Sequence, residues 1–214
     1  MANMKGKFIA LEGPDGSGKS TMMNLINQYL KEHKIDHIVT REPGGTAIGE
    51  KIRHLIVDRD NDSMGPETEA LLFAASRAQH VHEKILPALE QGKTVVCDRF
   101  LLSSLAYQGV GRDLGIEEVK AINDFGLRGV YPDLILFFHV DPEVTLLRKT
   151  KEGGDRLEAE GGMFHRGVYE GYMTLIEKYP ENITIIDASK PIDEVYRQTV
   201  EAINYLLRFE EERR

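Results

Sequence analysis

A glycine-rich stretch near the N-terminus constrains this chain more than any other segment. It reads GPDGSGKS over residues 13–20 and follows the apolar run 8–11. The segment after it, 20–32, has the apolar spacing of a helix. Glycines allow such a loop to turn its backbone N–H groups inward, and the helix N-terminus adds the positive end of its dipole. The stretch therefore predicts a strand, an anion-binding loop and a helix that together hold a nucleoside triphosphate.

Individual residues of this loop have separate expected roles. The pattern G-x-x-x-x-G-K-[ST] is matched at Gly13, Gly18, Lys19 and Ser20. We expect Lys19 to reach the β- and γ-phosphates of ATP and the Ser20 hydroxyl to bind Mg²⁺. The other loop residues expected to line the phosphates are Pro14, Asp15, Gly16, Ser17 and Thr21. A glycine-rich turn that matches by chance is the alternative, and the flanking strand and helix argue against it.

Apolar runs alternate with longer segments of helical period along the rest of the chain, which is typical of a parallel sheet with crossover helices. Strands are expected at 7–12, 37–41, 94–98, 134–140 and 183–187. Helices are expected at 20–32, 47–57, 67–91, 117–127, 142–149, 164–178 and 193–211. The prediction is an α/β, three-layer P-loop NTPase fold, in which a five-stranded parallel sheet carries helices on both faces. We expect one domain over residues 1–214, because no linker divides it.

Composition narrows the class of partner and compartment. The formal net charge of −8 gives a nucleic acid no general attraction, so we expect none as partner. No apolar run approaches the roughly 20 residues of a membrane span, and the N-terminus has no hydrophobic signal region. The single cysteine, Cys97, lies in an apolar run and is expected to be buried. A cytoplasmic protein without a membrane partner is therefore expected.

The residues after each strand are the expected site of the chemistry, because ligands of open α/β sheets lie beyond the carboxyl ends of the strands. REPGGT at 41–46 and DRF at 98–100 follow two of the strands. His80 and His82 are two apart on a predicted helix and point to nearly opposite sides, so we interpret both as surface or interface residues. The cation-rich segment 148–158 is either a mobile flap or an ordinary solvated loop.

At these residues the sequence closely resembles the bacterial thymidylate kinases, which phosphorylate dTMP with ATP and Mg²⁺ and form homodimers. The resemblance extends over essentially the whole chain. The matching segments are EGPDGSGKS at 12–20, REPGGT at 41–46, LFAASR at 72–77, DRF at 98–100, SSLAYQG at 103–109, YPD at 131–133 and DRLE at 155–158. One departure is Phe100, where the family usually has tyrosine.

The resemblance implies how the thymine base would be recognised. Phe73 would stack on the ring. Arg77 would donate to the carbonyl O4, and Ser104 or Gln108 would contact N3 directly or through water. Cytosine has a donor amine in place of O4, so a site built on these hydrogen bonds would reject it by up to about 10⁴-fold or more. Without the resemblance, Phe73 would be interpreted as a core residue of a helix.

The resemblance also implies how the sugar and phosphate are held. Tyr107 would lie beside C2′ and disfavour a ribose hydroxyl, while Asp15 would bond the 3′-OH. Arg99, assisted by Arg41, would hold the dTMP phosphate through a planar guanidinium. Asp98 would either steer Mg²⁺ through water or orient Arg99, and both possibilities stay open.

Phosphoryl transfer needs positioning and positive charge, and the acceptor is already a phosphate oxyanion. Eukaryotic relatives have an arginine in the phosphate loop where this chain has Gly16, so the cation must come from elsewhere. We expect a LID at 149–160 to close and deliver Arg156, with Arg148 as second candidate on the ATP phosphates. The expected catalytic set is Lys19, Asp98, Arg99 and Arg156.

Two other functions are compatible with the phosphate loop. A kinase for another nucleoside monophosphate would need a base pocket without the set Phe73, Arg77, Tyr107 and Gln108. A regulatory nucleotide switch of the GTPase kind should contain N-K-x-D, and the sequence contains no such motif. Dependence of ATP turnover on dTMP separates the three functions.

Overall fold

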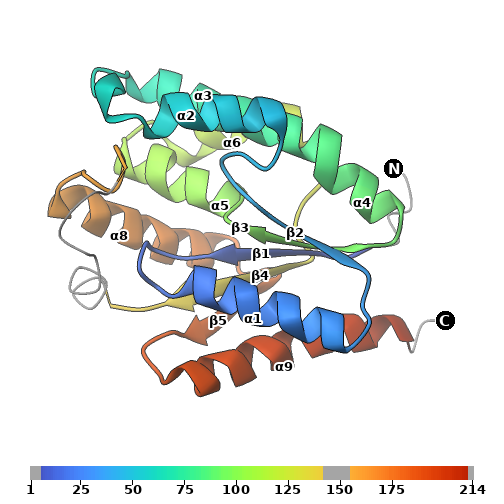
Figure 1. Ribbon diagram of the computed structural model, residues 1–214. Helices are drawn as coiled ribbons and strands as arrows, with labels where there is room; N and C mark the ends of the chain where they lie inside the picture. The colour runs from blue at the N-terminus through green and yellow to red at the C-terminus, as the bar shows by residue number, and fades with distance from the viewer. Residues whose placement is uncertain (1–5, 142–154, 212–214) are drawn as a thin grey trace.

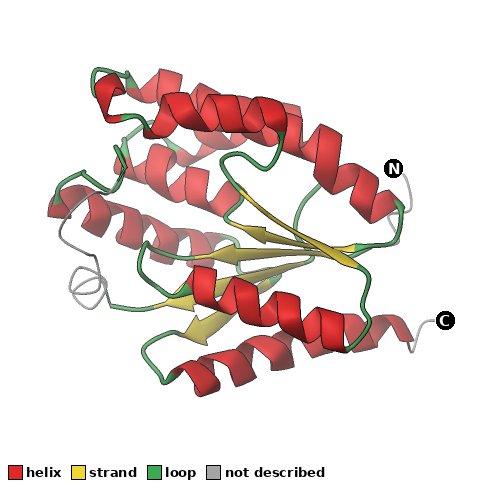
Figure 2. Cartoon of the chain, in the orientation of Figure 1, coloured by secondary structure: helices red, strands yellow, loops and turns green. Residues whose placement is uncertain are grey.

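The computed structural model describes residues 6–141 and 155–211, and the side chains up to residue 207. Five strands form one parallel sheet in the order β2-β3-β1-β4-β5. Their bounds are Phe8–Glu12 (β1), His37–Arg41 (β2), Thr94–Asp98 (β3), Leu134–His139 (β4) and Ile183–Asp187 (β5). The predicted five-stranded parallel sheet is confirmed, and Figures 1 and 2 show helices on both of its faces.

The helices follow the strands as crossover segments. Their bounds are Lys19–Glu32 (α1), Ala47–Val57 (α2), Arg59–Asn61 (η1), Pro66–His80 (α3), Val81–Ile85 (η2), Leu86–Glu90 (α4), Leu101–Ser104 (α5), Leu105–Gly111 (η3), Ile116–Leu127 (α6), Gly162–Lys178 (α8) and Ile192–Glu211 (α9). The helix predicted at 142–149 lies outside the described residues. Within the part that is described, no helix is both long and apolar enough to cross a bilayer.

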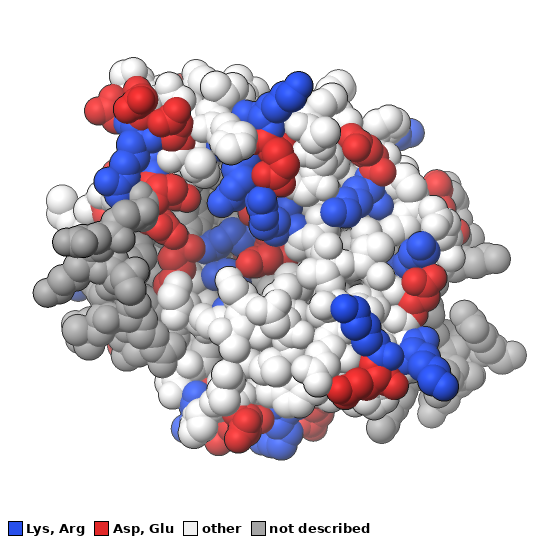
Figure 3. Space-filling model, viewed as in Figure 1, with Lys and Arg blue, Asp and Glu red and all other residues white. Residues whose placement is uncertain are grey.

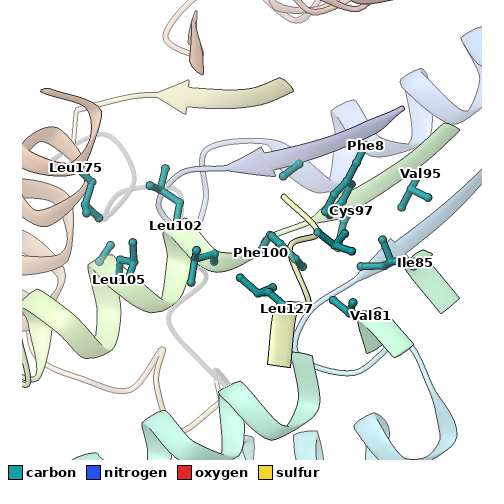
Figure 4. Close-up of a cluster of buried hydrophobic side chains, with 14 of the residues drawn as sticks. Phe8, Val81, Ile85, Val95, Cys97, Phe100, Leu102, Leu105, Leu127 and Leu175 are labelled. Atoms are coloured by element: carbon teal, nitrogen blue, oxygen red, sulfur yellow. The ribbon is translucent and has the colours of Figure 1, made fainter. Parts of the chain in front are cut away.

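Alternate residues of the central strand β1 enter two different cores, because successive side chains of a strand point to opposite faces. Ile9 and Leu11 pack with α1 and α9 on one face. Phe8 and Ala10 pack on the other face with residues of η2, α5, η3, α6 and α8. Figure 4 shows part of this second core, including Cys97, which is buried as predicted. Both faces of the sheet are therefore covered, which explains its apolar strands.

Two helical segments differ from the prediction. The single helix expected at 67–91 contains the wider π-helical turn η2, directly before a segment that begins with Leu86-Pro87. Proline lacks the N–H that a regular turn would need there. The segment 101–111, which is not among the expected helices, is helical as α5 and η3. Its start is stabilised by Glu12, whose Oε1 accepts the backbone N–H groups of Phe100 (2.9 Å) and Ser103 (3.1 Å).

Candidate active site

The phosphate loop has the backbone geometry that its glycines predict. Gly13 has a φ of 135°, and a Cβ there would lie 2.7 Å from the carbonyl oxygen of Phe138. Gly18 has a φ of 91° and immediately precedes α1. Only glycine adopts such angles at little cost, so the loop can turn its amides towards an anion at the N-terminus of the helix.

Lys19 lies across this loop. Its Nζ donates to the carbonyl oxygens of Gly13 (2.9 Å) and Pro14 (2.8 Å), and the side chain is buried. Burial, followed by the nearby cation of Arg99, lowers the Lys19 pKa to about 8. The ammonium group thus lies at the loop where phosphates would bind. Its present partners are neutral carbonyl oxygens, which a charged phosphate oxygen could replace.

Arg99 is the centre of the site's hydrogen-bond network. Its φ of 65° is unusual for a residue with a side chain and aims the guanidinium at the phosphate loop. Nη1 donates to Gly13 O (3.1 Å), Ser103 Oγ (3.0 Å) and Tyr172 OH (3.1 Å). Nη2 donates to Asp15. The Arg99 guanidinium therefore connects the phosphate loop to the segment that follows β3.

Asp15 and Tyr107 belong to the same network, because both contact the Arg99 guanidinium. The Tyr107 hydroxyl donates to Asp15 Oδ2 at 2.9 Å. Burial would raise the Asp15 pKa, but Arg99 and Lys19 hold it well below its usual range. The carboxylate stays ionised and can accept from a hydroxyl.

Most of the residues predicted for dTMP line one cavity of about 140 Å³. They are Asp15, Phe73, Arg77, Arg99, Ser104, Tyr107 and Gln108. Phe73 is half-buried and belongs to neither apolar core, which favours a ligand contact over the core interpretation. Tertiary structure brings these residues together from the phosphate loop, α3, β3, α5 and η3.

Arg77 is fixed deep in this cavity. Its Nε donates to Glu42 Oε2 (2.7 Å), Nη1 to Ser104 Oγ (3.0 Å) and to Asn123, and Nη2 to Phe100 O (2.9 Å). The side chain is 2% exposed. A buried, multiply held guanidinium is a rigid donor, as a base-reading residue must be.

Gln108 lies beside it, also buried. Its Nε2 donates to Glu69 Oε1 at 3.0 Å. Its Oε1 is buried and has no hydrogen-bond partner in the described part of the chain. A buried acceptor without a partner is uncommon, and a ligand that donates is one explanation.

A second hollow, of about 620 Å³, adjoins the phosphate loop at the β2 and β3 ends. Ser20, Arg41 and Asp98 line it, together with Glu50. Figure 3 shows basic and acidic side chains meeting around a hollow on this face. Arg41 donates to Glu50 Oε2 (3.0 Å) and Pro43 O (2.9 Å), so it lies in this hollow rather than among the residues lining the smaller cavity.

Asp98 has one oxygen, Oδ1, that is buried and makes no hydrogen bond to any described residue. No hydrogen bond joins its carboxylate to Arg99 among the residues described, and the contacts of Arg99 run to other groups. Asp98 and Ser20 face the same hollow. No cluster of three or more His, Cys, Asp or Glu side chains there or elsewhere in 6–141 and 155–211 could hold a metal alone.

Arg156 is buried and paired, and it is not among the residues that line the cavity, although Asp155 and Leu157 are. Its Nη2 lies 2.6 Å from Glu69 Oε2, and its Nε donates to Ile56 O at 2.8 Å. Its contacts are therefore with α2 and α3 and not with the phosphate loop. The second candidate, Arg148, falls outside the described residues, as does the first half of the expected LID.

Several residues of the site were not predicted from sequence. Arg53, Glu42 and Glu158 line the cavity. Arg53 lies three positions after Glu50 on α2, but Glu50 is not a predicted site residue either, so this spacing gives no sequence signal for Arg53. The interpretation of His80 as a surface or interface residue is wrong, because its side chain is fully buried. Its Nδ1 lies 2.9 Å from Glu42 Oε1, and its Nε2 lies 2.7 Å from Thr40 Oγ1.

Comparison with known proteins places this geometry in one family. A family model described as thymidylate kinase matches residues 11–199. A thymidylate kinase of Finegoldia magna is 57% identical over 92% of this chain and 97% of its own length. Those of Clostridium novyi and Caldanaerobacter subterraneus are 51% and 44% identical, over 91% and 96% of this chain and 96% and 98% of theirs. The phosphate loop, the Arg99 network and the aromatic cavity beside them are thus features of a chain that belongs to the thymidylate kinase family.

Proposed function

We propose that this protein transfers the γ-phosphate of ATP to dTMP, giving dTDP and ADP. The observation that carries the proposal is the shared cavity: Phe73, Arg77 and Gln108, the expected base contacts, line it together with Asp15 and Arg99. Asp15 belongs to the phosphate loop, and Arg99 donates to Gly13 O of the same loop. A pyrimidine bound at Phe73 thus has its phosphate directed at Arg99 and at the ATP phosphates. Family membership supports the same substrates.

Within this proposal the chain's residues divide the work of positioning and charge stabilisation. Lys19 and the amides of 13–18 hold the β- and γ-phosphates, and Arg99 holds the dTMP phosphate, with Arg41 next to it in the adjoining hollow. Asp15 accepts from the 3′-OH, and Tyr107 closes the space beside C2′. The acceptor oxygen carries a negative charge already, so no residue has to remove a proton from it.

Mg²⁺ is the proposed metal. The buried, unpartnered Oδ1 of Asp98 and the Ser20 hydroxyl face the same hollow beside the phosphate loop, and both are oxygen ligands of the type that Mg²⁺ prefers. Mg²⁺ usually keeps several waters and phosphate oxygens as ligands, so two protein groups suffice. When bound, it neutralises the charge that develops on the phosphates.

The catalytic cation is proposed to be Arg156, carried by a LID at 149–160 of a single domain, 1–214. Support comes from its position: Asp155, Leu157 and Glu158 line the nucleotide cavity, so Arg156 is one step in sequence from the site. Its pairing with Glu69 would have to be exchanged for ATP phosphate. A phosphate group with several negative charges competes well for a guanidinium.

We also propose that the protein is a cytoplasmic homodimer. Leu55 (51% exposed), Leu71 (56%) and Phe125 (93%) stand on α2, α3 and α6, which lie in one layer (Figure 1). Exposed apolar side chains on neighbouring elements favour an interface. Light scattering should give a mass of two chains for the unmodified protein. The double variant Phe125→Glu with Leu71→Glu should have the mass of a single chain.

A coupled ADP assay with a panel of monophosphates tests the reaction. We expect ATP turnover with dTMP and strong discrimination against dCMP, AMP, GMP and CMP. Turnover of a purine monophosphate as the best substrate would favour another nucleoside monophosphate kinase. ATP hydrolysis independent of any monophosphate would favour a nucleotide switch, and either outcome contradicts the proposal.

A further inference from the structure

Gln108 lines the cavity and carries a side-chain acceptor, and the glutamine alone does not determine which way this acceptor points. Gln108 is 1% exposed, and its Oε1 is the buried oxygen without a protein partner among the residues described. A glutamine amide has two possible orientations, which exchange an acceptor for a pair of donors. The orientation determines what the cavity can recognise.

Glu69 on α3 decides between these orientations. Its Oε1 lies 3.0 Å from Gln108 Nε2. An ionised carboxylate has no hydrogen to donate, so it pairs with the NH₂ side of the amide and would repel the carbonyl side. The carbonyl oxygen of Gln108 must then point away from Glu69, and Gln108 is one of the residues that line the cavity.

The charge and position of Glu69 are themselves held by two arginines. Arg112 donates from Nε (3.2 Å) and Nη2 (3.0 Å), and Arg156 from Nη2 (2.6 Å). Burial of this 1%-exposed side chain would raise its pKa, but hydrogen bonds from Arg112, Gln108 and Arg156 outweigh burial and lower it. Glu69 is therefore a fixed, ionised acceptor.

We propose that Glu69 is a specificity-determining positioning residue, which locks the Gln108 amide with its oxygen towards the base and so selects pyrimidines that carry a hydrogen on N3. This inference rests on the proposed binding of dTMP. Thymine has N3–H and meets an acceptor. Cytosine has a bare N3 nitrogen and meets acceptor against acceptor, a mismatch that buried sites reject strongly.

Arg77 supplies the complementary half of this code. A guanidinium has five N–H groups. Four are used within the protein, by Glu42, Ser104, Asn123 and Phe100 O. The N–H that remains is on Nη2, and Arg77 is one of the residues that line the cavity. One donor and one acceptor, both rigid, match the O4 and N3–H edge of thymine.

Glu69→Gln tests the lock, because a glutamine there can donate to the Gln108 oxygen and permit the opposite orientation. Calorimetric titration measures Kd for dTMP and for dCMP. We expect weaker dTMP binding and a fall of about tenfold or more in the dTMP-to-dCMP affinity ratio, the size of one buried hydrogen bond. Glu67→Gln, an exposed change of the same kind on α3, is the matched control and should leave the ratio unchanged.

A double-mutant cycle with Gln108→Met separates orientation from general damage. In the Gln108→Met background no amide remains, so Glu69→Gln should no longer change the affinity ratio. Glu69→Asp serves if Glu69→Gln does not fold, because it keeps the charge for both arginines but withdraws the carboxylate from Gln108. It should lower the ratio in the same direction.

The outcomes that overturn the inference are distinct from those that overturn the function. An equal loss of dTMP and dCMP affinity in the Glu69 variants, or an unchanged ratio, removes the role of Glu69 while leaving a dTMP kinase. An effect of Glu69→Gln on the ratio that persists in Gln108→Met also removes it. Unmodified protein that does not bind dTMP removes the proposed function itself.

Discussion

The Oγ atom of Ser103 lies 2.6 Å from the Oε2 atom of Glu12, and Arg99 Nη1 donates to the same Oγ at 3.0 Å. Tyr172 makes a parallel contact, accepting from Arg99 Nη1 (3.1 Å) and donating to Glu12 Oε2 (3.3 Å). The Ser103 and Tyr172 hydroxyls both donate to the buried Glu12 carboxylate. Their oxygen lone pairs therefore remain available to accept from the Arg99 guanidinium. Glu12 thus aims Arg99 without touching it.

Glu12→Gln should therefore impair dTMP binding more than it impairs folding. Its amide oxygen can still accept from Phe100 N and Ser103 N, but its NH₂ would face the two hydroxyls and turn their hydrogens towards Arg99. We expect KM for dTMP to rise about tenfold, the cost of one charged hydrogen bond, with KM for ATP nearly unchanged. Steady-state kinetics and thermal unfolding measure both.

Ser103→Ala is the partner variant in that experiment. Since Glu12 acts on Arg99 through the Ser103 hydroxyl, the two substitutions combined should raise KM by less than the product of their separate effects. Fully multiplicative effects would show that Glu12 does not act through Ser103.

Lys19 should impose a pH limit on ATP binding. Its pKa of about 8 means that the free protein loses this cation as the pH rises through 8, and affinity for an unreactive ATP analogue should fall above that value. Lys19→Arg, which stays charged, should lack the decline. The folded pKa lies below the unfolded value of about 10.4, so this group makes the free energy of unfolding rise between those pH values. An analogue affinity that is flat to pH 10 in the unmodified protein contradicts the prediction.

Phe73→Ala should weaken dTMP binding without destabilising the fold. The ring is half-buried and outside both cores, so its removal leaves the packing of the sheet intact. Loss of an aromatic stacking surface should raise KM for dTMP by about 10- to 100-fold, given about 1.5–3 kcal/mol for a buried phenylalanine. Tyr205→Ala, which removes an exposed ring on α9, controls for loss of a ring. A large drop in melting temperature with unchanged KM would return Phe73 to a core role.

Asp98→Asn should raise the Mg²⁺ concentration needed for half-maximal activity by about tenfold, because a neutral amide is a poorer ligand for a hard cation. Magnesium titrations at saturating ATP and dTMP measure this, with the surface variant Asp124→Asn as control. A raised KM for dTMP with unchanged Mg²⁺ dependence would show instead that Asp98 acts on Arg99.

Arg156→Ala should lower kcat by more than tenfold if its guanidinium stabilises the transferring phosphate, an effect that in other enzymes is worth about 10³–10⁵. Arg112→Ala is the matched control, because Arg112 also pairs with Glu69 but has no proposed phosphate contact. A loss below tenfold in folded Arg156→Ala, or an equal loss in both variants, would assign Arg156 to the support of Glu69 alone.

The sheet, the phosphate loop and most helix bounds follow from local sequence. Apolar runs, helical periodicity and the glycine pattern before Lys19 and Ser20 each depend on residues that are close together in the chain. The helical segment 101–111 could not be predicted this way. Its first turn depends on a carboxylate about ninety positions earlier, Glu12, and no local signal records that contact.

The sequence, through the segments that resemble the thymidylate kinases, indicated which groups would recognise a thymine nucleotide: a stacking ring, a guanidinium donor and an amide. Only tertiary structure decided how those groups are turned. Gln108 presents an acceptor because Glu69 lies behind it, Arg99 points at the phosphate loop because Glu12 and Asp15 hold it, and Arg156 rests on Glu69. Such orientations depend on charged partners from distant segments, which meet only when the chain has folded.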